Sequence, residues 1–549
     1  ASLSAKENNF LAAIHIEKKY VGLALLDIST GEFLCAQGDV AEIDKLITSL
    51  SPKELLRMRG TREYCEKNLS FKGSVFELDD WIYTDSAAQE RLLKQFSTST
   101  LKGFGVDHIP GAVIAAGSIL HYLDLTSHTR LSHITSLGRL DNRKYMHLDR
   151  FSIRNLELIE PLGAEGKSLL DVIDKTLSPM GGRMLRRWLL LPLLDIDKIR
   201  SRQDAVERFA EADDLRERGR EAVHRTGDIE RLGSRASSEK ITPRELLQLG
   251  EGIRGAMALR SLLAADGDPT LSRLAAGIPD VAEVADRIEH AIHPEAGNNF
   301  GKAPVIAEGV DIELDELRRL RGNSHDALLT IQNREIENTG ISSLKIHFNN
   351  VFGYYLEVRN THKDKVPDTW IRKQTLVNAE RYITPELKAL EEKIQGAEER
   401  IAIIEGRIYH ELLTQINARF ESLNAAASGV AVADCLLSFA EIAREYAYVR
   451  PEIDDSDTLS ITDGRHPVIE RFMPPGESYI ANSVTLDRDK RQIMMITGPN
   501  MSGKSALLRQ TALIALMAQT GSFVPAREVR MGVVDKIFTR VGASDSIST

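Results

Sequence analysis

The sequence contains little cysteine: Cys35, Cys65 and Cys435 are the only three in 549 residues. They lie far apart and form no CxxC pair, so they indicate neither a disulfide framework nor a zinc site, and a reducing cytoplasm is the expected setting. No run of about 18 apolar residues is present, and the first seven residues lack the apolar core of a signal peptide. We therefore expect a cytoplasmic protein with no membrane span.

The sequence also lacks an excess of positive charge, since its formal net charge is −10. A protein that coats nucleic acid over its whole surface is excluded, and any such contact has to come from a local basic patch. The hydrophobic share of 42% and the charged share of 27% are those of an ordinary folded protein. The length indicates about three or four domains.

The first hundred residues have the pattern of a mixed α/β domain. Residues 20–27 form an apolar, β-prone run, residues 29–31 (Ser-Thr-Gly) form a turn, and residues 32–36 resume the strand. Helical patterns follow at residues 41–49 and 87–96. A β-hairpin followed by helices is the prediction for this part.

From about residue 120 to 450 the pattern is helical. After Pro385 the apolar positions alternate at spacings of three and four, which predicts a long helix packed along another; they are Leu387, Leu390, Ile394, Ala397, Ile401, Ile404 and Ile408. Residues 311–334 are the expected partner helix. Between the two, residues 345–359 alternate as strands, so we predict a small β-rich module at the ends of two long helices.

The last hundred residues contain the motif with the most specific chemistry. Residues 459–462 and 492–497 are strand-like, a glycine-rich loop follows the second, and a helix is expected from about residue 504 to 519. The loop fits GxxxxGK[ST] without a mismatch, and its residues are Gly498, Pro499, Asn500, Met501, Ser502, Gly503, Lys504 and Ser505. In such a loop, backbone N–H groups surround phosphate oxygens. We therefore predict a site for ATP or ADP, with an accidental glycine turn as the alternative.

Individual residues of this loop have separate roles. Lys504 supplies a positive charge for the β- and γ-phosphates, and the Ser505 hydroxyl is the expected Mg²⁺ ligand. The helix that begins here directs its positive end at the phosphates. Asn500 is expected to bond phosphate or Mg²⁺-bound water, the alternative being a turn-forming role.

Hydrolysis also needs a carboxylate on a second strand to hold Mg²⁺. None of the residues after Ser505 forms an apolar strand that ends in Asp-Glu, and neither Asp535 nor Asp545 qualifies. No catalytic set is therefore complete in this sequence. We expect the chain alone to bind ATP weakly without turning it over, which leaves enzyme activity undecided.

With these motifs in place, the sequence resembles the MutS family of DNA mismatch-repair ATPases. The similar segments are residues 497–505 (TGPNMSGKS), 509–526, 464–467 (GRHP) and 537–543, and upstream residues 179–189, 350–359, 372–383 and 8–14 with 26–31. They cover nearly the whole chain in family order. One departure is Ser502, where the family more usually has glycine.

The resemblance implies a multidomain, α-rich α/β fold. Its expected parts are an RNase-H-like connector (1–118), a helical core with the first lever helices (119–330), a β-rich clamp (331–384), a returning lever helix and core (385–449), and part of a P-loop, ABC-type ATPase (450–549). It further implies a homodimer, double-stranded DNA and a MutL-type repair protein as partners, and coupling of nucleotide state to clamp movement. The family's N-terminal mismatch-reading domain, its signature loop and its Walker-B strand are expected outside this sequence.

The β-rich module is the candidate DNA-binding element. Residues 341–382 hold seven basic and four acidic residues, a local reversal of the overall negative charge. The residues expected to contact DNA are Lys363, Lys365, Arg372, Lys373, Asn378 and Arg381. The alternative is an ordinary solvated charged surface, and Val377 is a departure because the family often has lysine there.

Four further residues carry an expectation. By resemblance, Tyr479 stacks on adenine, with a surface tyrosine as the alternative. We expect His466 to order the local backbone rather than to catalyse. Asp27 invites a nuclease interpretation, but two-metal nucleases need more carboxylates than this hairpin supplies, so a structural role is favoured. Trp188 and Trp370 are expected to be core residues.

Two other functions compete with a mismatch-repair clamp. Some relatives of the family act in recombination as clamps or scaffolds without reading mismatches, and a chain with connector and clamp fits that too. A metabolic P-loop kinase is the third interpretation. It does not account for the long helices and the β-rich module.

Overall fold

The structure is a computed structural model that describes residues 4–498 and 503–540. The chain divides into two compact units. We call residues 1–240, 251–282 and 419–549 the body, and residues 241–250 and 283–418 the arm. Each is described by itself.

The body begins with a six-stranded sheet in the order β5-β4-β1-β2-β3-β6. Its strands are β1 (Phe10–Ile16), β2 (Val21–Asp27), β3 (Glu32–Gly38), β4 (Glu54–Met58), β5 (Ser74–Leu78) and β6 (Gly138–Arg139). The first three strands are antiparallel neighbours, while β4 runs parallel to β1 and β5 parallel to β4. The hairpin predicted over residues 20–36 is confirmed.

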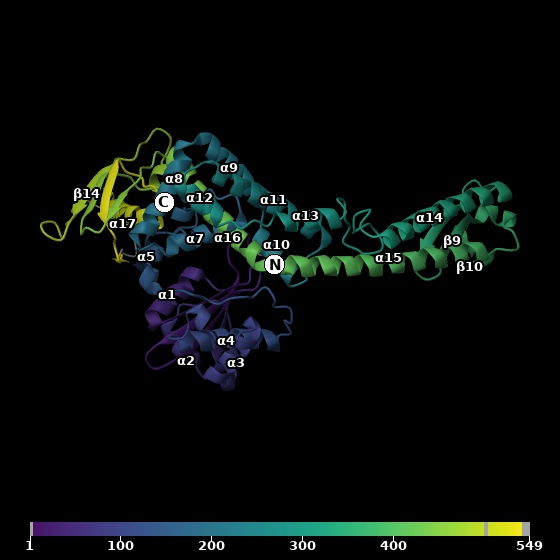
Figure 1. The fold of residues 1–549 in the computed structure, drawn as a ribbon, viewed down its shortest axis with the longest axis horizontal. Helices are drawn as coiled ribbons and strands as arrows, with labels where there is room; N and C mark the ends of the chain where they lie inside the picture. Colours follow the sequence, from purple (N-terminus) through teal and green to yellow (C-terminus); the bar gives the residue numbers. More distant parts are fainter. Residues whose placement is uncertain (1–3, 499–502, 541–549) are drawn as a thin grey trace. The chain divides into compact units, whose positions relative to one another are not determined.

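Helices cover both faces of this sheet, as expected for strands that are apolar on both sides. On one face lie α3 (Asp85–Phe96) and α4 (Pro110–Leu125), which run next to each other (Figure 1). On the other face lie α1 (Val40–Leu50) and the buried side of α2 (Arg62–Asn68). Gly22 permits a close approach of α4, because a Cβ there would lie 2.1 Å from the backbone of Gly111. The helices predicted at 41–49 and 87–96 are confirmed.

The helical core of the body surrounds one long apolar helix, α16 (Phe420–Glu445). It is long enough and, with a mean hydropathy of 1.5, apolar enough to cross a membrane, but 72% of that stretch is buried inside the fold. The helices that contact it include α6 (Leu169–Ile173), α7 (Pro179–Leu190), α8 (Ile196–Glu211), α9 (Asp213–Thr226), α10 (Ile229–Ser237) and α12 (Pro269–Ala276). The buried Asp434 of α16 accepts hydrogen bonds from Leu177 N and Ser178 N and so fixes the start of α7. We interpret α16 as a core helix.

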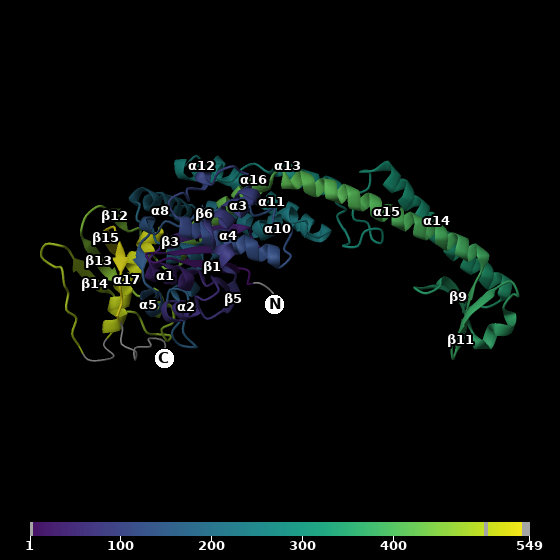
Figure 2. The same cartoon turned by 90° about the horizontal axis from the view of Figure 1, so that it is seen from below.

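The arm is built on two long helices, α14 (Ile312–Thr339) and α15 (Pro385–Asn417), which run side by side (Figure 2). At about 1.5 Å per residue they are roughly 40 and 50 Å long. Five of the seven predicted seam positions of α15 are buried, and Leu390 and Ile408 are half-buried. The predicted pairing is therefore confirmed, although Leu320 of α14 is exposed. The arm also contains α13 (Ala282–Ala291), and α11 (Pro243–Ala265) contributes residues to both units.

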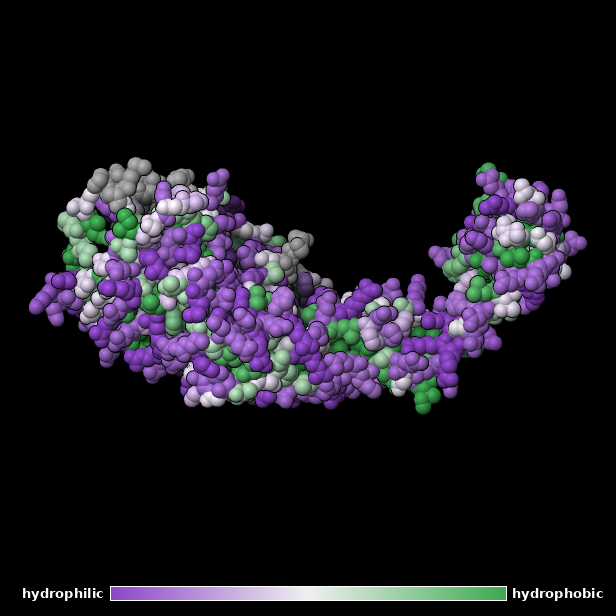
Figure 3. Space-filling model, turned by 90° about the horizontal axis from the view of Figure 1, so that it is seen from above, coloured by the Kyte–Doolittle hydropathy of each residue, from purple (hydrophilic) through white to green (hydrophobic). Residues whose placement is uncertain are grey.

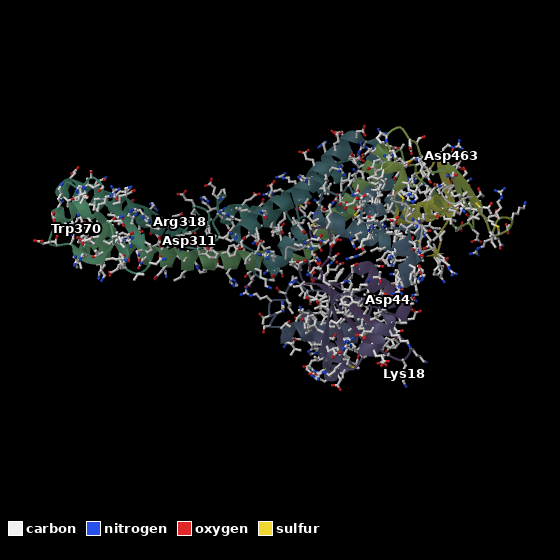
Figure 4. The ribbon with its side chains drawn as sticks, turned by 180° about the vertical axis from the view of Figure 1, so that it is seen from behind. Lys18, Asp44, Asp311, Arg318, Trp370 and Asp463 are labelled. Atoms are coloured by element: carbon white, nitrogen blue, oxygen red, sulfur yellow. The ribbon has the colours of Figure 1, made fainter. Side chains whose placement is uncertain are left out.

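Between α14 and α15 the chain forms a four-stranded antiparallel sheet, which we call the arm sheet. Its order is β10-β11-β9-β8, and its strands are β8 (Lys345–Asn349), β9 (Gly353–Arg359), β10 (Ile371–Thr375) and β11 (Ala379–Ile383). Trp370, Leu356 and Tyr382 of this sheet pack in one core with Leu387 and Ile394 of α15. Figure 4 labels Trp370 at this end of the arm. The predicted β-rich module is confirmed, with Trp370 as a core residue.

The last part of the body contains a four-stranded sheet in the order β12-β15-β13-β14. Its strands are β12 (Glu452–Asp454), β13 (Leu459–Gly464), β14 (Asn482–Leu486) and β15 (Glu528–Gly532), and α17 (Lys504–Thr520) packs against β13. A two-stranded pairing joins β7 (His147–Leu148) with β16 (Lys536–Ile537). The predictions of a strand at 459–462 and a helix at 504–519 are confirmed.

The strand predicted over residues 492–497 is wrong. These residues have no strand geometry, and Ile493 and Met495 are 88% and 85% exposed. A strand needs a neighbour to pair its backbone N–H and C=O groups, and no described strand pairs with this segment. Its apolar composition alone therefore does not produce a strand here.

Candidate functional site

The glycine-rich loop closes at the N-terminus of α17. Gly503 stands immediately before the helix with φ 81°, a left-handed conformation that favours glycine. The Lys504 Nζ donates a hydrogen bond of 2.5 Å to Gly498 O, so its side chain reaches across the ends of the loop. The predicted residues Pro499, Asn500, Met501 and Ser502 lie outside the described residues. Gly498, Gly503, Lys504 and Ser505 are brought together as the motif predicts.

The described ends of this loop fit a nucleotide phosphate with its Mg²⁺. Among the described residues, no atom lies within 4 Å of the position that a Cβ on Gly503 would take. The Lys504 ammonium contacts the Gly498 carbonyl, which a phosphate oxygen can replace by a stronger charge-assisted bond. The half-buried Ser505 follows on the first turn of α17.

Tyr479 is attached to the same helix. Its hydroxyl donates a hydrogen bond of 2.7 Å to Gln510 Oε1 on α17, and its ring is half-buried. Burial, reinforced by the negative charge of Glu470, raises the pKa of Tyr479 to about 12, so the phenol is neutral at physiological pH. A neutral ring attached to the helix that follows the phosphate loop is compatible with the expected stacking on adenine, which remains a prediction.

His466 is buried at the base of this region. Its Nδ1 accepts hydrogen bonds of 3.2 Å from both Val468 N and Ile469 N. Burial, together with the nearby Arg509 charge, lowers the pKa of His466 to about 3, so the imidazole is neutral. The expected backbone-ordering role agrees with this geometry, and a neutral buried ring of this kind is a poor proton donor.

The predicted DNA-contacting residues all lie on or beside the arm sheet. Lys363 and Lys365 are exposed on the 3₁₀ helix Asn360–Lys365, Lys373 is exposed on β10, and Asn378 is exposed in the β10–β11 turn. Asn360 connects the two segments, because its Nδ2 donates to Val377 O at 2.8 Å and its backbone N–H donates to Asn378 O at 3.1 Å. The two segments are therefore neighbours in space.

The two arginines of the predicted set are already engaged. Arg381 is half-buried, pairs with Glu357 at 3.3 Å, donates to Gln374 at 2.9 Å, and lies 4.5 Å from the centre of the Tyr355 ring. Arg372 lies 3.4 Å from the buried Glu380. The three lysines thus offer positive charge to solvent more openly than the arginines do.

The surface of the arm sheet is mainly hydrophilic, with a smaller hydrophobic area (Figure 3). The exposed apolar side chains of the sheet and its turns are Phe348, Val351, Ile371 and Val377, the last being 92% exposed. Val377 is therefore exposed beside Asn378, and the neighbouring lysines are exposed as well. The valine that replaces the family's usual lysine therefore lies on the surface of the sheet, outside its core.

Asp27 and Trp188, which the sequence also singled out, contact neighbouring residues of the fold. The fully buried carboxylate of Asp27 accepts hydrogen bonds from Asn8 Nδ2, Asn9 N and Ser29 N, all within 3.1 Å. Its oxygens are thereby satisfied, in agreement with the expected structural role. Trp188 is only half-buried, so it lies at the margin of the core, where its ring contacts the buried Phe439 and the Arg202 guanidinium lies 3.5 Å from the ring centre.

Sequence reasoning missed the residues that hold the phosphate-loop helix. Arg509 on α17 is buried and forms an ion pair with Glu157 of the core, and Gln510 holds Tyr479. The partners of each are distant in sequence. The only signal was the position of Arg509 and Gln510 within a largely apolar helix, and it did not identify their partners.

Comparisons with known proteins agree with this architecture. The family model described as MutS domain II matches residues 9–135, MutS domain III matches residues 152–440, and MutS domain V matches residues 494–549. The chain is 53% identical over 546 residues to the DNA mismatch repair protein MutS of Parabacteroides distasonis, and 52% identical over the same length to that of Bacteroides fragilis. It is 48% identical to that of Flavobacterium psychrophilum. Each alignment covers 100% of this chain and 63% of the relative.

The molecule is thus a multidomain α/β protein with a helical core and several separate sheets. Since one domain model alone matches more than half of the chain, it belongs to the MutS family. It spans 63% of the length of these curated relatives.

Proposed function

We propose that this chain is the nucleotide-binding and DNA-binding part of a mismatch-repair clamp protein. The observation that carries the proposal is the joint presence of a phosphate-loop helix and a lysine-bearing sheet on a long two-helix arm in one chain of the MutS family. The curated relatives are named DNA mismatch repair proteins. A P-loop kinase does not need such an arm.

The nucleotide part is the loop at residues 498–505 with Tyr479. Lys504 is placed to contact the β- and γ-phosphates, Ser505 supplies its hydroxyl to Mg²⁺, and Tyr479 stacks on adenine. Backbone N–H groups at the start of α17 add donors to the phosphates. A bound ATP would supply the phosphate groups and the base that these residues bind and orient, and hydrolysis by this chain alone is not part of the proposal.

The DNA part is the arm sheet. Lys363, Lys365 and Lys373 carry exposed charges that suit phosphate contacts, and such contacts are independent of base sequence. Asn378 adds an exposed amide next to them. Arg372 and Arg381 contribute after exchange of a carboxylate partner for a DNA phosphate, or by shaping the sheet.

The remaining parts take the roles that the family implies. The N-terminal sheet is proposed as the RNase-H-like connector, α14 and α15 as the levers, the arm sheet as the clamp, and residues 450–549 as part of an ABC-type ATPase domain. In the intact protein we propose a homodimer that acts with a MutL-type partner in the cytoplasm. Clamp position and nucleotide binding are coupled, which requires two clamp states that differ in nucleotide affinity.

A binding experiment with a fluorescent ATP analogue and Mg²⁺ tests the nucleotide part. We expect saturable binding by the chain and a loss of at least tenfold in affinity for Lys504→Ala, because a charge-assisted contact to phosphate is removed. Lys490→Ala, another lysine of the same region that the loop does not include, is the matched control and should bind as the unchanged chain does. Equal binding by all three would contradict the assignment.

The second candidate is a clamp or scaffold in recombination that does not read mismatches. No structural observation favours it over mismatch repair. The two differ in whether the full-length protein prefers a mismatched duplex, and that comparison separates them.

A further inference from the structure

A basic cleft lies between the N-terminal sheet and the helical core of the body. Its volume is about 910 Å³. One wall is formed by residues 47–53 and 70–73, and the other by α5 (Arg150–Asn155), residues 159–162 and part of α7. Sites for small organic ligands commonly occupy about 300–1,000 Å³, so this cleft has room for considerably more than one phosphate group.

The charge of the cleft is opposite to that of the chain. The basic residues that line it are Lys53, Lys72, Arg150, Arg154 and Arg186. Among the described residues of the lining, Glu160 is the one carboxylate. This excess of positive charge is found in a protein with a formal net charge of −10.

Three of these cations have no carboxylate partner among the described residues: Lys53, Lys72 and Arg154, which are all exposed. The other two are only singly paired, Arg150 with Asp44 at 3.3 Å and Arg186 with Glu7 at 3.3 Å. Asp44 is also held by Ser70 N at 2.7 Å, so it fixes the two walls at this point. The cleft therefore presents several unneutralised charges from walls that are fixed to each other.

An aromatic platform lies among these charges. The Phe151 ring is 56% exposed, and the Arg150 guanidinium lies 4.6 Å from the ring centre. An exposed aromatic ring that lies against an arginine is a surface on which a planar base stacks. Phe71 lines the opposite wall and is half-buried.

We propose that this cleft binds a nucleotide-type ligand, in which phosphate groups are joined to an aromatic base. The free cations contact the phosphates, and Phe151 stacks on the base. A single nucleic-acid strand and a free nucleotide both have this chemistry. An acidic peptide would use the charges but would leave the exposed ring without a planar partner, which is why the nucleotide is favoured. The site is separate from the phosphate loop and from the arm sheet.

The test measures binding of a labelled short oligothymidylate to the whole chain by fluorescence anisotropy over a range of salt concentrations. We expect Arg154→Ala and Lys72→Ala each to weaken binding by about tenfold. Each should also lower the slope of log affinity against log salt by about 0.7, the value for one lost contact to a single strand. Phe151→Leu should weaken binding and leave that slope unchanged, because it removes stacking and no charge.

Matched variants separate this site from general effects. Lys18→Ala removes an exposed lysine of the same N-terminal domain outside the cleft, and Figure 4 shows Lys18 apart from Asp44. It should bind as the unchanged chain does. Glu160→Gln should tighten binding several-fold, because it removes the carboxylate of the lining. A gain of affinity cannot result from misfolding.

Competition with thymidine diphosphate and with polyglutamate identifies the ligand class. Displacement by thymidine diphosphate at comparable concentrations supports a free-nucleotide site, and displacement only by unlabelled oligothymidylate supports a strand site. Stronger displacement by polyglutamate than by either would overturn the proposal in favour of an acidic peptide. If Arg154→Ala, Lys72→Ala and Phe151→Leu all bind oligothymidylate as tightly as the unchanged chain does, the proposal is overturned.

Discussion

The guanidinium of Arg509 lies 3.7 Å from the carboxylate of Glu157, and their side chains are only 3% and 12% exposed. Arg509 belongs to the helix that follows the phosphate loop, and Glu157 follows α5 in the core. Glu157 also accepts a hydrogen bond of 2.7 Å from Leu162 N. One buried ion pair therefore fixes the nucleotide-site helix to a core loop that is more than 300 residues away in sequence.

Replacing one partner of this pair should be destabilising. Glu157→Gln leaves the buried Arg509 charge without its carboxylate, and we expect a loss of about 3 kcal/mol in the free energy of unfolding. Urea unfolding of the chain measures it. The double variant Glu157→Gln, Arg509→Met should be less destabilised than the sum of the two single variants, and strict additivity would show that the pair does not interact.

Acid should destabilise the protein through His466. Its pKa is about 3 in the folded chain and about 6.5 when unfolded. Between these values the unfolded chain binds the additional proton, so stability is full above pH 6.5 and falls as the pH decreases toward 3. The greatest slope is about 1.4 kcal/mol per pH unit.

His466→Asn tests this origin of the acid sensitivity. Asparagine places an oxygen near the position of Nδ1 and retains an acceptor for Val468 N and Ile469 N, but it does not titrate. Unfolding free energies measured between pH 7 and pH 4 should fall less steeply for the variant. An unchanged slope would mean that other groups cause the acid sensitivity.

Tyr479 should contribute to nucleotide affinity through its ring. Tyr479→Phe removes the hydrogen bond to Gln510 but keeps the aromatic face, so affinity should fall by less than about threefold. Tyr479→Ala removes the stacking surface and should weaken binding by about tenfold or more. Titration with a fluorescent ATP analogue measures both. Equal losses in the two variants would assign the effect to the hydroxyl and exclude stacking.

Substitution of an exposed lysine and substitution of Arg381 in the arm sheet should have different effects on DNA affinity and on stability. Lys373→Ala removes an exposed charge, so duplex affinity and its salt slope should fall, the slope by about 0.9, while stability stays unchanged. Arg381→Ala removes contacts to Glu357, Gln374 and Tyr355, and stability should fall by about 1–2 kcal/mol. Salt-dependent DNA titrations and thermal unfolding separate the two effects. A stable Arg381→Ala variant with a reduced salt slope would show that Arg381 contacts phosphate directly.

The sequence predicted those features that depend on local patterns. The hairpin at residues 20–36, the paired helices α14 and α15, and the helix after Gly503 all result from periodicity or turn residues within a short window. Residues 492–497 are the counterexample, because their apolar run has strand composition and lacks a paired neighbour. Strand formation is a property of two segments, and a window that contains one of them cannot establish it.

The candidate sites differ in the same way: one is formed by a short stretch of sequence, and the other by segments that are distant in sequence. The phosphate loop is contiguous in sequence and was predicted residue by residue. The basic cleft joins Lys53 and Lys72 to Arg154 and Arg186, which are brought together only by packing of the N-terminal sheet on the core. The engagement of Arg381 by Glu357 and Tyr355 likewise depends on strand register. No pattern in the sequence specified these contacts.

Titration of the chain against a matched duplex and a G·T-mismatched duplex, each at low and moderate salt, tests the proposal that it binds duplex DNA through the arm sheet. We expect similar affinities for the two duplexes, both strongly reduced by salt, because the contacts are to phosphates. Binding should be weaker for Lys363→Ala and Lys365→Ala. No binding at low salt, or binding that these variants leave unchanged, would contradict DNA binding through the arm sheet.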